Sequence, residues 1–184
     1  CISHSKTNFA MMHCVMGMLT EVSELAVQGG TVTAAEDVVL VKSANSYISF
    51  CGSTIHAENG ILVHSVINDD PSATRVHGDE VYGVNVALRD MTVTGSILHE
   101  DTERTMAVSL EHTDLTGAIR NAFVKLDAAS HWTASDDSLV ILVDTTDTTG
   151  IDAPNGVTIF AVNGSGSDLS GSYTLRSGGT LHIL

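Results

Sequence analysis

Four acidic residues recur at a nearly constant interval and are the first candidates for a chemical site. Glu36, Glu58, Asp79 and Glu100 are separated by intervals of 22, 21 and 21, and His56 and His77 lie at the same interval beside them. If each interval is one turn of a coil, these carboxylates form a column at one corner. Carboxylates stacked in this way repel one another, so they splay into water, raise their pKa values or bind a cation such as Ca²⁺. We interpret them as solvated turn residues, with a Ca²⁺ site as the alternative.

A carbohydrate-cleaving site would need two carboxylates that face one groove. The acidic candidates are Asp69–Asp70, Asp136–Asp137, Asp90, Asp114 and Asp127, and the basic ones are Arg89, Arg104, Arg120 and Lys125. Nothing in their spacing fixes a shared face. Aromatic residues make up 4% of the chain, which argues against a sugar-stacking cleft, and we expect Trp132 to pack against the core. The nine His form no zinc motif. The sequence therefore predicts no catalytic residue and no cofactor other than the Ca²⁺ alternative.

The charge balance limits the partners. The 184 residues include 22 Asp and Glu against 8 Lys and Arg, a formal net charge of −14. Such a surface repels phosphate backbones and anionic lipids, so nucleic acid and membrane surfaces are disfavoured, and no apolar run is long enough to span a bilayer. Cations, neutral glycans and proteins remain as partners. Cys1, Cys14 and Cys51 form no disulfide framework, and whether Cys14 and Cys51 pair is left open.

An internal repeat predicts the architecture that must position these residues. Residues 36–43 resemble 58–65, and residues 85–97 resemble 107–119, both after a shift of 22. Short β-branched segments separated by Gly and Asn turns, returning at this interval, favour stacked coils with parallel strands. Apolar residues are then expected to stack in inward columns, namely Ile55, Val76, Ile97 and Ile119, and Val41, Val63, Val84 and Met106. Residues 68–72 interrupt the pattern as a polar turn or small excursion.

The N-terminal segment, residues 1–24, is expected to cover the open edge of this stack. Apolar residues from Phe9 to Val22 fall at helical spacing, which predicts a short capping helix. The alternative is a first coil with a strand over residues 15–20. We therefore divide the chain into residues 1–24, an N-terminal cap or first coil, and residues 25–184, a single coiled domain of seven or eight coils.

Residues 110–119 (Leu-Glu-His-Thr-Asp-Leu-Thr-Gly-Ala-Ile) and 126–138 are similar to a known type of repeat. They resemble the adhesin-like repeats of secreted bacterial right-handed parallel β-helix proteins, in the style of autotransporter passengers. Residues 169–175 and 178–183 fit the same style. The resemblance implies an all-β, single-stranded right-handed parallel β-helix at the cell surface or outside the cell, with a recognition or scaffold role. It carries over no catalytic residue.

These observations lead to three functional hypotheses. The first is a non-enzymatic extracellular adhesin-like or structural domain that binds glycan or protein through its sheet faces and loops. The second is a carbohydrate-active β-helix enzyme, such as a polysaccharide lyase or glycoside hydrolase. The third is a module that self-associates through its coil ends into filaments.

Overall fold

The computed structural model describes residues 2–3, 7–13, 22–69 and 83–184, and this part of the chain is all β with no helix. The strands are β1 (Ile2–Ser3), β2 (Ala10–His13), β3 (Ser23–Gln28), β4 (Thr31–Ala34), β5 (Val39–Lys42), β6 (Ser46–Cys51), β7 (Thr54–Ala57), β8 (Ile61–Val66), β9 (Val84–Thr94), β10 (Ser96–His99), β11 (Met106–Thr116), β12 (Ile119–Leu126), β13 (His131–Thr133), β14 (Ser138–Leu142), β15 (Ile151–Asp152), β16 (Thr158–Asn163), β17 (Ser172–Thr174) and β18 (Thr180–Ile183). No described segment is a helix that could cross a membrane.

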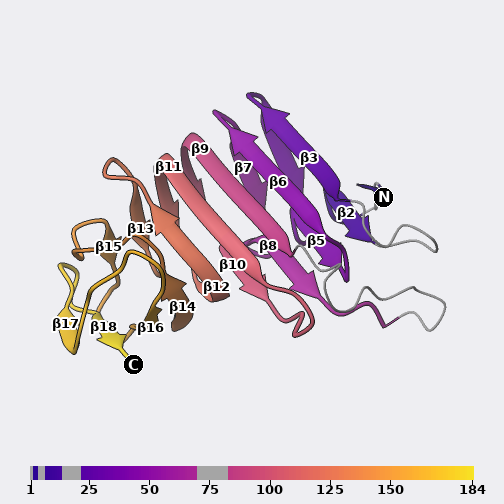
Figure 1. Ribbon diagram of the computed structural model, residues 1–184. Helices are drawn as coiled ribbons and strands as arrows, with labels where there is room; N and C mark the ends of the chain where they lie inside the picture. Colours follow the sequence, from indigo (N-terminus) through magenta and orange to yellow (C-terminus); the bar gives the residue numbers. More distant parts are fainter. Residues whose placement is uncertain (1, 4–6, 14–21, 70–82) are drawn as a thin grey trace.

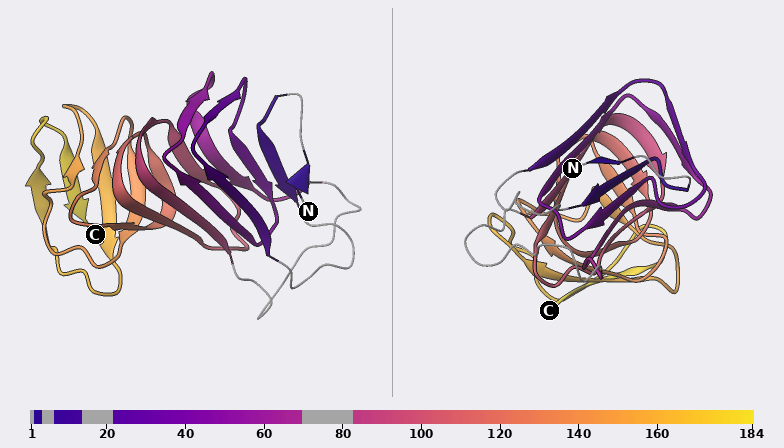
Figure 2. Two further views of the ribbon diagram at one scale, coloured as in Figure 1. Left: turned by 90° about the horizontal axis from the view of Figure 1, so that it is seen from above. Right: turned by 90° about the vertical axis from the view of Figure 1, so that its right-hand side faces the viewer.

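The chain winds around one axis, with its two ends at opposite ends of the coil (Figure 1). The first face contains β3, β6 and the first halves of β9 and β11, all paired in parallel. The second contains β4 and β7 and, further along, the second halves of β9 and β11 with β13 and β15. The third contains β2, β5, β8 and β10. The chain visits the faces in this order, and the end-on view in Figure 2 shows its windings around the axis.

A ladder of left-handed residues turns the chain from the first face to the second. Gly29, Gly52, Asp90 and His112 have φ of 68°, 59°, 52° and 48°. They occupy one corner in successive coils, because Gly29 donates its N–H to the Cys51 carbonyl and Gly52 donates to the Arg89 carbonyl. Asp and His adopt this backbone region at some cost. The bend at Asp90 and His112 lets β9 and β11 each span two faces.

The second sequence repeat is confirmed position by position. Val84 pairs with Met106 and Thr94 with Thr116, so β9 and β11 keep the predicted shift throughout. The first repeat predicts the wrong register, since it would place Val39 beside Ile61, whereas Val39 pairs with Val63. A shift by two positions keeps the same side chains pointing inward, so hydrophobic alternation alone cannot distinguish the two registers.

The predicted inward columns are right where the coils are regular and wrong across the interruption. Ile97 does stack on Ile119, but its other neighbour is Val63, and Ile55 lies on the second face beside Val32. Val76 lies outside the described residues. The cause is a long coil, which runs from Tyr47 in β6 to its paired neighbour Asn85 in β9. Glu58 and Glu100 are therefore little more than one coil apart, whereas the sequence spacing suggested two coils.

The same correction applies to the second column. Val84 stacks on Met106 as predicted. Val63 lies on the third face, where it pairs with Val39 and not with the predicted Val41, which pairs with Ser65. Inside the coil the aliphatic side chains are fully buried, together with Trp132, which is 0% exposed as expected. The Trp132 indole donates a hydrogen bond to the Gly117 carbonyl, 2.9 Å away.

The N-terminal capping helix is not formed over residues 10–13. Ala10–His13 is strand β2, which pairs in parallel with β5. Ala10 and Met12 are buried, because the alternation of a strand places both on the inner side. A strand also satisfies the backbone groups at the edge of β5, which a helix cannot do. The alternative strand over residues 15–20 lies outside the described residues.

The coil changes shape after β11. The first residues of β12, Ile119 and Arg120, pair with β10 on the third face, whereas Ala107 pairs with Phe123 on the first face. Strand β12 thus joins the two faces, and β14, β16 and β18 extend the joined surface. Strand β17 pairs antiparallel with β18 along its remaining edge.

Gly117 tests the close stacking of coils at the corner between the second and third faces. A Cβ at this position would overlap the Gly95 carbonyl of the neighbouring coil. We expect Gly117→Ala to lower the free energy of unfolding by more than about 3 kcal/mol, because backbone must move. Gly156→Ala is the matched control, since its Cβ meets open space and only its φ of +88° opposes the change, at about 1 kcal/mol. Equal urea midpoints for the two variants would contradict this account of the corner.

Candidate functional site

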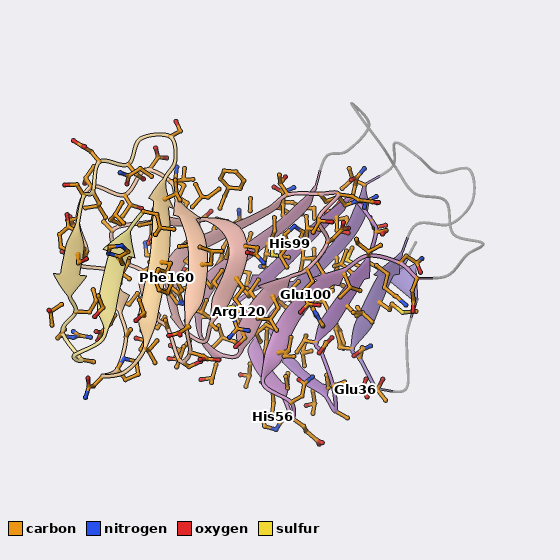
Figure 3. All side chains as sticks on the ribbon, turned by 90° about the horizontal axis from the view of Figure 1, so that it is seen from below. Glu36, His56, His99, Glu100, Arg120 and Phe160 are labelled. Atoms are coloured by element: carbon orange, nitrogen blue, oxygen red, sulfur yellow. The ribbon has the colours of Figure 1, made fainter. Side chains whose placement is uncertain are left out.

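The predicted carboxylate column is spread over two corners. Glu36 and Glu58 precede β5 and β8, whereas Glu100 follows β10 at the other end of the third face, where its N–H donates to the Ser65 carbonyl. Figure 3 shows Glu36 and His56 along the lower margin and Glu100 higher on the face. Asp79 and His77 lie outside the described residues. Within the described ranges no three His, Cys, Asp or Glu side chains are arranged so that they could hold a metal ion, so the Ca²⁺ hypothesis finds no ligand set among these residues.

Glu100 belongs to a different cluster that the sequence spacing did not reveal. Nδ1 of His64 lies 3.2 Å from Oδ2 of Asp37, and Nε2 lies 3.6 Å from Oε2 of Glu100. Asn59 donates a hydrogen bond to Oδ1 of the same Asp37 carboxylate, at 2.8 Å. Asp37 is buried and His64 is largely so, whereas Glu100 is mostly exposed. The cluster joins three successive coils of the third face.

The two inner members of this cluster shift each other's pKa. Burial alone would raise the pKa of Asp37, but hydrogen bonds from His64 and Asn59 and the charge of His64 outweigh it, so the pKa is lowered. The pKa of His64 is raised, mainly by its hydrogen bond to Asp37. Burial would lower this pKa, but the charges of Asp37 and Glu100 raise it further. The arrangement favours a protonated His64 held by two carboxylates.

A polar groove lies on the outer side of the second face, in the C-terminal half of the coil. Three adjoining hollows of about 320, 270 and 340 Å³ have His131 in their lining. We call the whole depression the His131 groove. Besides His131 its polar lining residues are Asp114, Thr116, Asp127, Thr133, Asp144, Thr145, Thr146, Asp147, Thr148, Thr149, Asp152, Thr174 and Arg176, with Leu, Ile, Ala and Gly between them.

Two outward columns of the second face lead into this groove, and their members from Asp114 and Thr116 onward form its floor. Thr92, Asp114 and His131 are paired in successive strands, and Nδ1 of His131 lies 2.9 Å from Oδ1 of Asp114. In the second column, Thr94, Thr116 and Thr133 stack above Asp152. The alternation of the strands sends their other side chains, such as Leu115 and Trp132, into the core. Hydroxyl groups and an Asp–His pair therefore face the solvent in a fixed spacing.

Hydrogen-bonded turns fix the walls of the groove. Asp127 accepts hydrogen bonds from the Ser130 hydroxyl and from the Ala129 and His112 amides, and the Ser130 bond leads the lowering of its pKa. Asp147 accepts the Thr149 amide, which lowers its pKa in the same way. These Asp residues form short side-chain-to-backbone turns. The walls therefore carry carboxylates that stay ionised at neutral pH.

Asp152 anchors the far wall. Burial would raise its pKa, but the Ser177 hydroxyl and amide and the Ala153 amide donate to it, and the charge of Arg176 adds to them, so the pKa is lowered. Nη2 of Arg176 lies 3.4 Å from Oδ2 of Asp152, and its side chain is 83% exposed. The anchor holds the β17–β18 region against β15 and places a cation at the rim of the groove.

The acidic candidates from the sequence do not gather into a catalytic pair. Asp114 and Asp127 lie in different hollows of the His131 groove. Asp90 lies at the corner formed by the left-handed residues, where its Oδ2 is 3.8 Å from the Sγ of the free Cys51. The remaining described candidates form ion pairs, Lys42 with Asp69, Arg89 with Glu111, Arg120 with Asp136 and Lys125 with Asp144. Asp137 accepts the Thr158 amide, and Asp70 lies outside the described residues.

Arg104 is part of a buried pair and lies away from the groove. Its fully buried Nη1 donates to Oδ2 of Asp101 at 2.9 Å, and Nε2 of His99 lies 2.9 Å from its carbonyl oxygen. The pair closes the loop between β10 and β11. We assign it a structural role.

Sequence reasoning missed Asp37, His64 and Arg176, and it did not place His131 in a groove. The interval between Asp37 and His64 matches no repeat, because the contact runs diagonally between coils. Arg176 reaches the groove through the final turns, where the repeat has ended. Asp114 and His131 lie in the two segments of the adhesin-like resemblance, but their pairing follows a shift of 17 that no sequence repeat indicated.

The Asp37–His64 pair makes stability depend on pH. A raised pKa means that the His64 contribution is complete below about pH 6.5 and is lost as the pH rises through the folded pKa. The lowered pKa of Asp37 means that its contribution is present above about pH 4 and is lost as the pH falls through the folded value. We expect His64→Gln to lower the Tm at about pH 5.5 by roughly 2–4 °C, and to have a smaller effect at about pH 8.5.

The exposed His56 of β7 provides the control. His56→Gln should keep the wild-type dependence of Tm on pH, measured by calorimetry in the same buffers. If His64→Gln lowers the Tm equally at both pH values, the ion pair is not what stabilises this face.

Comparison with known proteins finds no match to this chain among family models, curated proteins or solved structures. Its function is therefore inferred from the geometry of the His131 groove and the faces around it.

Proposed function

We propose that this chain is a right-handed parallel β-helix of the type found in secreted adhesin-like proteins. Its regular repeating unit is the coil that leads from β9 to β11. The proposal is supported by the parallel pairing of strands from successive coils and by the unbroken register between these two strands. It is supported further by the three faces that the chain visits in a fixed order. A coil of this kind presents its outer positions as long, flat surfaces.

The function that the geometry supports best is non-enzymatic recognition outside the cell or at its surface. The observation that carries it is the His131 groove, in which three hollows meet on a rigid sheet. Its walls are held by turns whose carboxylates already accept backbone amides. Its floor offers stacked Thr hydroxyls and the Asp114–His131 pair. Rigid, pre-positioned polar groups favour binding, because little order is lost when a ligand docks.

The chemistry of the groove favours a neutral glycan. Hydroxyls and ionised carboxylates are good partners for sugar hydroxyls, which donate and accept hydrogen bonds. A net charge of −14 disfavours acidic polysaccharides and nucleic acids. A protein loop rich in hydroxyl or amide groups would use the same contacts.

A glycan array followed by calorimetry tests this proposal. We expect a neutral oligosaccharide to bind, and Thr116→Val to weaken binding by about fivefold, since a lost hydrogen bond is worth about 1 kcal/mol. Thr31→Val is the matched control, because Thr31 is also an exposed residue of the second face but belongs to β4, far from the groove. Its affinity should equal that of the wild type.

Two results would contradict recognition as the function of the groove. One is equal affinity for wild type and Thr116→Val. The other is the appearance of new reducing ends or unsaturated sugars during the incubation. Such products would establish the alternative, a carbohydrate-active enzyme, for which Asp114 and His131 would be the first residues to replace.

A further inference from the structure

In the part of the chain that the structure describes, most of the large exposed apolar side chains lie together. Within the described ranges six such residues are exposed, and five of them lie on the joined surface of β12, β14, β16 and β18 or directly after it. They are Phe123, Leu139, Phe160, Val162 and Leu184, at 37–65% exposure. The sixth, Val22, stands far from them along the coil. Exposed apolar residues that stand singly are ordinary, whereas a contiguous group of five is the part of the described surface best suited to an apolar contact.

The strand register makes this cluster continuous, and we call it the apolar face. Leu139 pairs with Phe160, and Ile141 pairs with both Phe123 and Val162. The Leu184 amide donates to the Ala161 carbonyl, which brings Leu184 beside Val162. Phe160 also meets the His182 ring edge-on, with ring centroids 6.1 Å apart. Arg120 and Phe160 are labelled on this part of the coil in Figure 3.

The apolar face also differs from the rest of the chain in its charge. Strands β12, β14, β16 and β18 contain no Asp or Glu, although the chain has 22 such residues. The cations at the margins, Arg120 and Lys125, pair with Asp136 and Asp144, which stand in the loops before and after β14. The centre is therefore apolar, and the rim carries both signs of charge.

We propose that a second copy of this chain packs on the apolar face, with the same face of each copy in contact. Two molecules of charge −14 repel each other wherever their carboxylates meet, and this face is where they can approach with the fewest carboxylates between them. Arg120 and Asp136 are already paired within each copy, so this part of the rim adds no unpaired charge to the contact. Two sheets stacked in this way lie about 10 Å apart.

The size of the face makes the dimer weak. Four strands about 4.8 Å apart, with about five residues each, give a sheet face of roughly 300 Å². A standard interface buries about 800 Å² on each partner. We therefore expect a dissociation constant in the range of about 10 µM to 1 mM. This contact uses the side of the coil, and it is separate from association through the coil ends.

Sedimentation equilibrium from about 10 µM to 1 mM chain tests the proposal at two salt concentrations. Raising sodium chloride from about 20 mM to 500 mM shortens the Debye length from about 20 Å to about 4 Å and screens the repulsion between the acidic bodies. We expect the dimer to tighten at least fivefold in high salt. An interface formed by salt bridges would loosen instead.

Two exposed substitutions on the face and one elsewhere complete the experiment. Leu139→Lys and Phe160→Lys should each weaken dimerisation at least tenfold while the circular dichroism spectrum and Tm stay close to those of the wild type. Val22→Lys places a charge at an exposed apolar position outside the face, and it should leave the dimerisation constant unchanged. The proposal is overturned by a monomer at every concentration, by a dimer that salt dissociates, or by equal effects of the three variants.

Discussion

Each winding of this chain is stabilised by the next winding, and this dependence shapes everything else in the structure. The backbone groups of β9 bond to β6 on one side and β11 on the other, so no described coil of the middle region completes its hydrogen bonds alone. The inner side chains follow the same rule, since Ile97 is buried between Val63 and Ile119. Corners must repeat as well, and for this reason Asp90 and His112 adopt the left-handed backbone that Gly29 and Gly52 adopt more readily.

This dependence fixes the inner positions and leaves the outer ones free to differ between faces. On the second face the outer positions carry Thr, Asp and His and form the His131 groove. On the joined surface of β12, β14, β16 and β18 they carry Phe, Leu and Val without a carboxylate. Different strands thus enclose one shared core and present two outer surfaces of opposite character. The groove that we propose binds a glycan and the apolar face that we propose binds a second copy can coexist, because they lie on different sides of the coil.

The sequence predicts this architecture wherever the coils are regular. The match of residues 85–97 to 107–119 gives the register of β9 and β11 correctly, because an unbroken repeat leaves no other pairing. It fails at Val39 and Val63, where a shift by two positions preserves the inward pattern. It fails again for Glu100, since the long coil between Tyr47 and Asn85 is counted as two by the spacing. Contacts that run diagonally between coils, such as Asp37 with His64, leave no period to detect, and the His131 groove depends on turns beyond the regular repeat.

The most direct test of this account is the pairing of β9 with β11 in solution. In a parallel arrangement, the nuclear Overhauser contacts between backbone protons should link the paired residues of the two strands, such as Val86 with Val108 and Val93 with Leu115. Those contacts should run in the same direction along both strands. A series of short Hα–Hα contacts whose partners run in opposite directions would show an antiparallel hairpin, and it would contradict the coil on which both surfaces depend.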